Sequence, residues 1–235
     1  MSRLKLFYIV GLHVLLVALI FQLFDLPARW SAGGATERPP HFDALVTFHE
    51  RVLGNAEDGF IAVLGDSHVQ GLAVHRLHPR AVNLGIGRDT TAGVIQRLPR
   101  YGPLSRAAAM VLAIGLNDLE FLNEQETAAG VADILRALPA GLPVVCSAVL
   151  PVAADAPGRE NYAARITELN RRIQAVCAAD SRCRFVDAGP RLVDESAALA
   201  PEYHVGDGVH LSPRGAELWI ELLREGLGST LEAQP

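Results

Sequence analysis

Four short polar segments of this sequence contain residue types that together could carry out nucleophilic chemistry. A serine that attacks an ester carbonyl needs a base to take its proton, and a histidine, whose pKa lies near neutrality, is the usual one. The histidine needs a carboxylate that orients it, and the developing oxyanion needs hydrogen-bond donors fixed in advance. Residues of all these types lie in GDSH (65–68), NLGIGRDT (83–90), GLND (115–118) and GDGVHLS (206–212).

Ser67 is the candidate nucleophile, because it lies in a turn between an apolar run and a helical segment, where the helix N-terminus adds positive potential. Asp207 and His210 are three residues apart, so one loop can present the base and its carboxylate partner to one place. We prefer His210 to His204 as the base, since His204 precedes Asp207. The candidate oxyanion donors are the backbone N–H groups of Ser67 and Arg88, with Gly87 as the alternative to Arg88, and the side-chain amide of Asn117.

The elements that position these polar segments are five short apolar runs. Longer amphipathic stretches separate one apolar run from the next. The runs are continuous rather than alternating, as expected of strands that are buried on both faces of a parallel sheet. We therefore predict an α/β fold, a three-layer α/β/α sandwich with a five-stranded parallel sheet. Ligands bind such sheets at the carboxyl ends of the strands, where all four polar segments would converge. The predicted strands are 60–65, 81–85, 109–115, 143–149 and 184–188, and the predicted helices are 41–53, 68–78, 91–100, 122–138, 158–179 and 212–227.

The N-terminus differs in composition from the rest of the chain. Residues 6–24 carry no formal charge, and a helix needs about 20 apolar residues to span a bilayer. We expect residues 1–24 to form a transmembrane anchor, with a cleaved secretory signal or a buried core helix as the alternatives. Arg3 and Lys5 precede the apolar segment, so the N-terminus would stay in the cytoplasm. The anchor would then lie in a bacterial-type inner membrane, with a linker over 25–40 and a periplasmic or extracellular domain over 41–230.

The net charge, the cysteines and the histidines limit the partners and ligands that the sequence indicates. The formal net charge of −5 argues against a nucleic-acid partner. Three cysteines cannot all pair within the chain; Cys177 and Cys183 flank a short polar loop and can pair in an oxidising compartment, or all three are free. His75 and His78 lie three residues apart, but without a further ligand at a supporting spacing they indicate no metal site. The sequence does not indicate an oligomeric state.

The order and spacing of the four polar segments resemble those of the SGNH (GDSL) hydrolase family, which includes lysophospholipase-like and acetylhydrolase-like esterases. GDSH looks like the first block of that family, NLGIGRDTTAGVIQRL (83–98) like the second, GLND like the third and DGVHLSPRG (207–215) like the last. The resemblance implies a flavodoxin-like sandwich that uses no metal and no cofactor. It also implies hydrolysis of carboxylic esters, of acetyl or short acyl groups, through an acyl-serine, on a small-molecule, glycan or lipid ester.

Three positions depart from the pattern of the family or bear on the reaction. Arg88 stands where relatives usually carry a glycine; its backbone N–H is retained, and its side chain either clamps an anionic substrate group or is an exposed arginine paired with a carboxylate. Leu116 replaces a glycine that is common in relatives. His68 directly follows the serine, and some membrane-linked acyltransferases also carry GDSH. An O-acyltransferase that passes an acetyl group to an envelope polysaccharide is therefore the alternative function, with the same residues.

Overall fold

A parallel sheet of five strands forms the centre of the molecule. We describe it from a computed structural model of the chain, in which residues 39–232 are described. The strand order is β2-β1-β3-β4-β5, the order of flavodoxin-like doubly wound folds. Every residue of β1, β3 and β4 is buried, which explains their continuous apolar sequences. The strands are β1 (Ile61–Gly65), β2 (Ala81–Gly85), β3 (Ala109–Ala113), β4 (Val144–Ser147) and β5 (Cys183–Val186).

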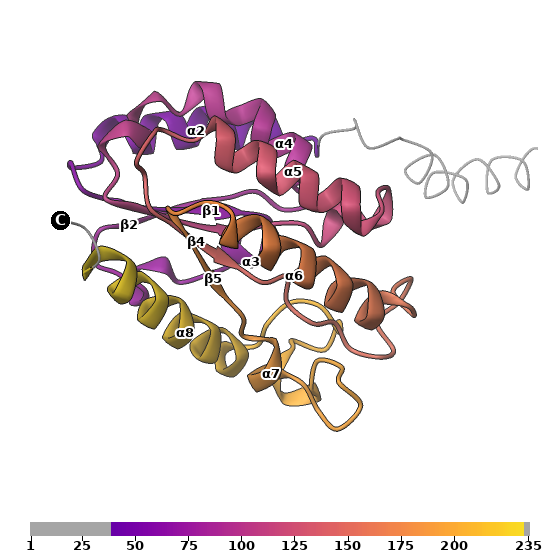
Figure 1. The fold of residues 1–235 in the computed structure, drawn as a ribbon. Helices are drawn as coiled ribbons and strands as arrows, with labels where there is room; N and C mark the ends of the chain where they lie inside the picture. Colours follow the sequence, from indigo (N-terminus) through magenta and orange to yellow (C-terminus); the bar gives the residue numbers. More distant parts are fainter. Residues whose placement is uncertain (1–38, 233–235) are drawn as a thin grey trace, which may run out of the picture. The chain divides into compact units, whose positions relative to one another are not determined.

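Helices cover both faces of this sheet and complete the predicted three layers (Figure 1). One face packs against four helices: α2 (Phe42–Asn55), α4 (Thr91–Arg97), α5 (Glu124–Ala137) and α6 (Tyr162–Ala178). The other face packs against α8 (Pro213–Glu232), together with the short helices α3 (Ser67–Gln70) and α7 (Gly189–Leu192). Short 3₁₀ turns link these elements: η1 (Val74–Arg76), η2 (Leu98–Arg100), η3 (Gly102–Arg106), η4 (Asn117–Glu120) and η5 (Pro201–Tyr203).

The helix expected over 68–78 was wrong in its extent. The chain forms only the four residues of α3, is interrupted at Gly71, and resumes as the 3₁₀ turn η1. The side chain of Asn83 on β2 donates to the carbonyls of Val69 and Leu72, which a continuing helix would have used itself. Contacts with Asn83 and tighter backbone turns, from Leu72 N–H to Val69 and from Val74 N–H to Leu72, therefore take the place of the α-helical hydrogen bonds at this point.

The expected membrane anchor over 1–24 and most of the linker lie outside the described residues. Among the helices of residues 39–232, none is both long enough and apolar enough to cross a bilayer. Cys177, near the end of α6, forms a disulfide with Cys183 at the start of β5, with their Cα atoms 5.1 Å apart. Cys146 on β4 is a free, buried thiol.

A buried arginine ties together the carboxyl ends of β1 and β2. The guanidinium of Arg97 donates to the carbonyl of Gly65 at 3.1 Å and to that of Leu84 at 2.7 Å. It also forms an ion pair with Asp89 at 2.8 Å and donates to the hydroxyl of Tyr101 at 3.1 Å. Both charged side chains are almost wholly inaccessible to solvent. Arg97 thus holds the turn after β2, on which part of the candidate site is built.

Candidate active site

Ser67 is the first residue of α3, and only Asp66 separates it from the end of β1. The parallel register pairs Gly65 with Gly85 and with Ala113, so β1, β2 and β3 end at the same level of the sheet. Asp66 caps α3, because its carboxylate accepts the backbone N–H of His68 at 3.0 Å. A residue at the first position of a helix has no intrahelical acceptor for its N–H. The backbone N–H of Ser67, at this edge of the sheet, is therefore an available donor.

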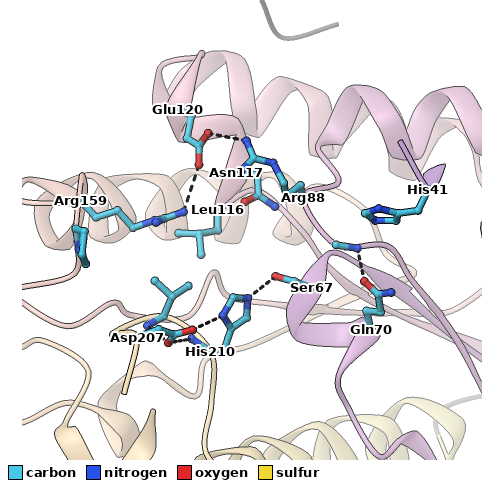
Figure 2. Close-up of a pocket in the computed structure, with 13 residues that line it drawn as sticks. His41, Ser67, Gln70, Arg88, Leu116, Asn117, Glu120, Arg159, Asp207 and His210 are labelled. Carbon is cyan, nitrogen blue, oxygen red and sulfur yellow. Dashed lines mark hydrogen bonds and ion pairs between the residues drawn. The ribbon is translucent and has the colours of Figure 1, made fainter. Parts of the chain in front are cut away.

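His210 links Ser67 to Asp207 through a continuous line of hydrogen bonds (Figure 2). Its Nε2 lies 3.0 Å from Ser67 Oγ, and its Nδ1 lies 2.6 Å from Asp207 Oδ2. The other oxygen of Asp207 accepts the backbone N–H groups of Val209 and His210, both at 2.9 Å. Burial acts to raise the pKa of Asp207, but the hydrogen bonds from the His210 ring and from these backbone N–H groups outweigh it and lower the pKa to about 2.

The ionised carboxylate decides which nitrogen of His210 carries the proton. An ionised carboxylate can only accept hydrogen bonds, so Nδ1 is the protonated nitrogen of the neutral ring. Nε2 is then free to accept the proton of the Ser67 hydroxyl, which is the arrangement that a serine nucleophile needs.

His204, the other histidine of this loop, has a different environment. Its Nδ1 accepts the backbone N–H groups of Gly206 at 3.0 Å and Gly208 at 3.1 Å, so it shapes the loop that carries Asp207. Gly208 adopts φ +74°, and a Cβ there would lie about 3 Å from Ala153 and Ala156. The loop can pack against this neighbouring segment only because glycine stands at this position.

The donors expected around the oxyanion differ in how they are already engaged. The N–H of Gly87 donates to Gln70 Oε1 at 2.6 Å, whereas the N–H of Arg88 has no acceptor among the described residues. Asn117, at the start of η4 after β3, uses one of its two amide hydrogens to donate to the carbonyl of Asp89 at 3.0 Å. Its second amide hydrogen is left for a ligand.

Arg88 adopts a backbone conformation that an arginine rarely takes. It has φ +63° at the third position of a turn closed by the bond from Asp89 N–H to the Ile86 carbonyl at 3.1 Å. The left-handed backbone conformation costs a non-glycine residue about 1–2 kcal/mol of conformational free energy. This position of the turn therefore favours glycine, but the residue there is an arginine. Residues held in such conformations cluster at functional sites.

A cleft of about 530 Å³ opens over Ser67. It contains all the predicted site residues: Ser67, Gly87, Arg88, Asn117, Asp207 and His210. The sequence analysis did not identify the other polar residues of its wall, which come from four separate segments. They are His41, Gln70, Glu120 and Arg159.

Beneath the cleft, two titratable groups beside Ser67 have strongly shifted pKa values. Burial raises the pKa of Asp66 to about 7, and burial lowers the pKa of His68 to about 4. The His68 ring lies 5.6 Å from that of His210 and 6.3 Å from that of Trp219. The His68 Nε2 atom is buried without a hydrogen-bond partner among the described residues. At neutral pH, His68 therefore places a neutral ring beside His210.

Substituting His68 with glutamine is expected to change how stability depends on pH. Between pH 6.5 and 4 the unfolded chain protonates His68 and the folded protein does not, so this residue costs stability as pH falls through that window. At pH 5 the cost is about 2 kcal/mol relative to pH 7, from 1.36 kcal/mol per pKa unit. Urea unfolding at both pH values should show the wild type losing about 2 kcal/mol more than His68→Gln. Equal losses in the two proteins would contradict this environment for His68.

A family model described as the GDSL-like lipase/acylhydrolase family matches residues 59–218, which span all four polar segments. The chain belongs to this family. It is therefore a hydrolase of the esterase class, and the SGNH resemblance of its motifs is confirmed. A search of curated proteins finds no match.

Several solved structures share the fold of this hydrolase, although their sequences are less than 25% identical to it. A GDSL-like lipase from Bacteroides thetaiotaomicron is 24% identical, with a TM-score of 0.67 over 78% of this chain and 97% of the other. A lipase/acylhydrolase from Enterococcus faecalis is 19% identical, with a TM-score of 0.64 over 75% and 99%. A variant of an acetyl xylan esterase from Geobacillus stearothermophilus is 16% identical, with a TM-score of 0.58 over 73% and 96%.

Proposed function

We propose that this hydrolase cleaves carboxylic esters of acetyl or other short acyl groups through an acyl-enzyme on Ser67. The observation that carries the proposal is the unbroken hydrogen-bonded line from Ser67 Oγ through His210 to Asp207, at 3.0 Å and 2.6 Å. A serine, a histidine and an ionised carboxylate in this order are a nucleophile, its base and the group that orients the base.

In the first step, Ser67 Oγ attacks the ester carbonyl while its proton passes to His210 Nε2. The imidazolium that forms is stabilised by the Asp207 carboxylate, whose low pKa keeps it ionised. As the tetrahedral intermediate collapses, the bond to the alcohol breaks and His210 gives its proton to the leaving oxygen. Water then attacks the acyl-serine with His210 again as base, which releases the acid and restores the Ser67 hydroxyl.

The negative charge on the carbonyl oxygen is held by three donors in this proposal: the N–H groups of Ser67 and Arg88 and the amide of Asn117. The engagement of the Gly87 N–H by Gln70 favours Arg88 over Gly87 as the second backbone donor. Each such donor is worth about 3–4 kcal/mol of transition-state stabilisation.

The disulfide supports a location outside the cytoplasm, because disulfides persist mainly in oxidising compartments. Together with the predicted anchor over 1–24, it favours a domain that faces the periplasm or the cell exterior. Acetylated glycans and lysophospholipids are substrates that such a domain could reach. An O-acyltransferase would form the same acyl-serine and differ only in using a sugar hydroxyl in place of water.

A fluorophosphonate probe and a generic ester test the proposal together. The wild type and Ser229→Ala, a control at an exposed serine on α8, should be labelled and should hydrolyse 4-nitrophenyl acetate, whereas Ser67→Ala should not be labelled. Labelling of Ser67→Ala at wild-type level would refute Ser67 as the nucleophile. Product analysis with and without an oligosaccharide acceptor then separates the two reactions, since transfer yields acetylated sugar and hydrolysis yields acetate.

A further inference from the structure

Two arginines share a single carboxylate on the wall of the cleft. Arg88 Nη2 lies 3.5 Å from Glu120 Oε2, and Arg159 Nη2 lies 3.3 Å from Glu120 Oε1. Figure 2 shows the two guanidinium groups reaching the two oxygens of Glu120 from separate segments. All three side chains line the same cleft as Ser67. The other carboxylate of the lining, Asp207, is engaged by His210 and by backbone N–H groups, so this part of the wall carries one positive charge in excess.

The contacts of these arginines are few and long. Charge-assisted hydrogen bonds between nitrogen and oxygen are usually about 2.7–2.9 Å long, and a guanidinium has five N–H donors. Among the described residues, each of the two guanidinium groups forms only one hydrogen bond, the one with Glu120. The Nε atom of Arg159 is buried and has no hydrogen-bond partner within residues 39–232, although the side chain as a whole is 20% exposed. Most of the donors of this pair are therefore unused.

A neighbouring arginine shows what a structural arginine looks like in this protein. Arg165 packs over the Tyr162 ring at 5.6 Å, the same distance at which Arg159 packs over it. Its Nε binds Glu124 at 2.5 Å, and its two terminal nitrogens donate to the carbonyls of Leu119 and Leu122 at 2.7 and 2.8 Å. Arg165 is fully engaged by the fold, and Arg159 is not.

The backbone of Arg88 adds an independent observation. Its φ of +63° would be met without strain by glycine, and its side chain is 62% exposed, so neither turn geometry nor packing requires an arginine there. Local strain that packing does not explain points to a role of the side chain in function. A guanidinium beside the reacting serine suits an anionic ligand, because it binds carboxylate and phosphate groups through two parallel hydrogen bonds.

We propose that Arg88 and Arg159 together bind an anionic group, such as a carboxylate, carried by the ester substrate. The inference rests on the proposed esterase function and names the substrate class of the same cleft. In the free enzyme Glu120 occupies part of the binding capacity of the two arginines. In the complex the substrate anion takes the donors that Glu120 leaves unused.

Matched pairs of esters with and without a carboxylate test the proposal. One pair, 4-nitrophenyl acetate and mono-4-nitrophenyl succinate, places the anion on the acyl side. The other pair, phenyl acetate and 3-acetoxybenzoate, places it on the alcohol side. In one of the two pairs, we expect the kcat/KM of the wild type to be about tenfold higher for the anionic ester than for the neutral one. A ratio of about ten is roughly what one charge-assisted hydrogen bond contributes. This ratio should fall as ionic strength rises.

Three variants should change the ratio of kcat/KM for the anionic ester to kcat/KM for the neutral ester. A purely structural role of these residues would not change this ratio. Arg88→Gly retains a backbone donor and relieves the turn, and Arg159→Gln removes a charge; both should lower the ratio at least fivefold. Glu120→Gln frees the two arginines and should raise it severalfold. Arg171→Gln, at an exposed arginine on α6 that pairs with Glu168, is the matched control and should leave the ratio unchanged.

The failure of this inference is distinguishable from that of the esterase proposal. If Ser67 is labelled and neutral esters are hydrolysed, but neither pair shows a preference for the anion, only the arginine proposal is overturned. If no ester is hydrolysed, calorimetry of mono-4-nitrophenyl succinate binding decides. Ser67→Ala should bind it about tenfold more tightly than Ser67→Ala/Arg159→Gln, and equal affinities would overturn the proposal.

Discussion

Replacing Ser67 with alanine is expected to lower kcat/KM on 4-nitrophenyl acetate by about 10⁴-fold or more. The substitution removes the nucleophile and leaves the His210–Asp207 pair and the oxyanion donors in place. His210→Ala should reduce the rate by a similar factor, because Ser67 then has no group 3.0 Å away to take its proton. The rates are measured by initial velocities over a range of substrate concentrations, with active enzyme counted by fluorophosphonate titration in the wild type.

The double variant Ser67→Ala/His210→Ala provides the stricter test. Residues that act as one unit have strongly non-additive effects, so the double variant should be no slower than either single variant to within a few fold. Thermal melting of all three variants checks that they fold, and Ser229→Ala is the control for a distant serine. A double variant whose loss equals the product of the two single losses would show that Ser67 and His210 act independently.

Arg97→Met is expected to destabilise the fold by about 3–5 kcal/mol, the usual cost of removing one partner of a buried ion pair. The variant leaves the buried Asp89 carboxylate without its cation and removes the guanidinium donor from the carbonyls of Gly65 and Leu84. Burial already raises the pKa of Asp89 to about 6 against the opposing effect of Arg97. Without Arg97 that pKa rises further, so the loss measured by urea unfolding should be smaller at pH 5 than at pH 8.

Two further variants separate the ion pair from a general effect of losing an arginine. Arg100→Met removes an exposed arginine that pairs with Glu50, and exposed pairs contribute only about 0–1 kcal/mol. Arg97→Met/Asp89→Asn should recover part of the stability, because no charge is then left buried. A loss below 1 kcal/mol in Arg97→Met, or a loss that is larger at pH 5 than at pH 8, would contradict the buried pair.

The same network connects stability to the candidate site. The side chain of Asp89 pairs with Arg97, and its backbone carbonyl accepts one amide hydrogen of Asn117. This hydrogen bond orients the second amide hydrogen of Asn117. Thr91 binds Asp118, the residue after Asn117, through its hydroxyl at 2.5 Å and its backbone N–H at 3.1 Å. Arg97 thus positions a proposed oxyanion donor without touching the substrate.

Much of the architecture was determined by local patterns in the sequence. Short continuous apolar runs are typical of strands buried on both faces, and their alternation with amphipathic stretches indicates crossover helices. These two patterns together predicted the five-stranded parallel sheet. Polar, glycine-containing turns after the strands then indicated the edge where Ser67, Asn117 and the Asp207–His210 loop would converge. Each of these inferences depends on residues that are close together in the chain.

Tertiary structure alone decided which donors and charges are engaged. Ser67 and His210 are 143 residues apart, and their 3.0 Å contact depends on the placement of two loops by the whole sheet. Sequence spacing does not predict the hydrogen bond from the Gly87 N–H to Gln70 or the meeting of Arg88 and Arg159 at Glu120. It also did not predict that α3 ends after Gln70. Whether a hydrogen-bonding group is occupied or free depends on neighbours brought close by folding, and local sequence patterns do not contain that information.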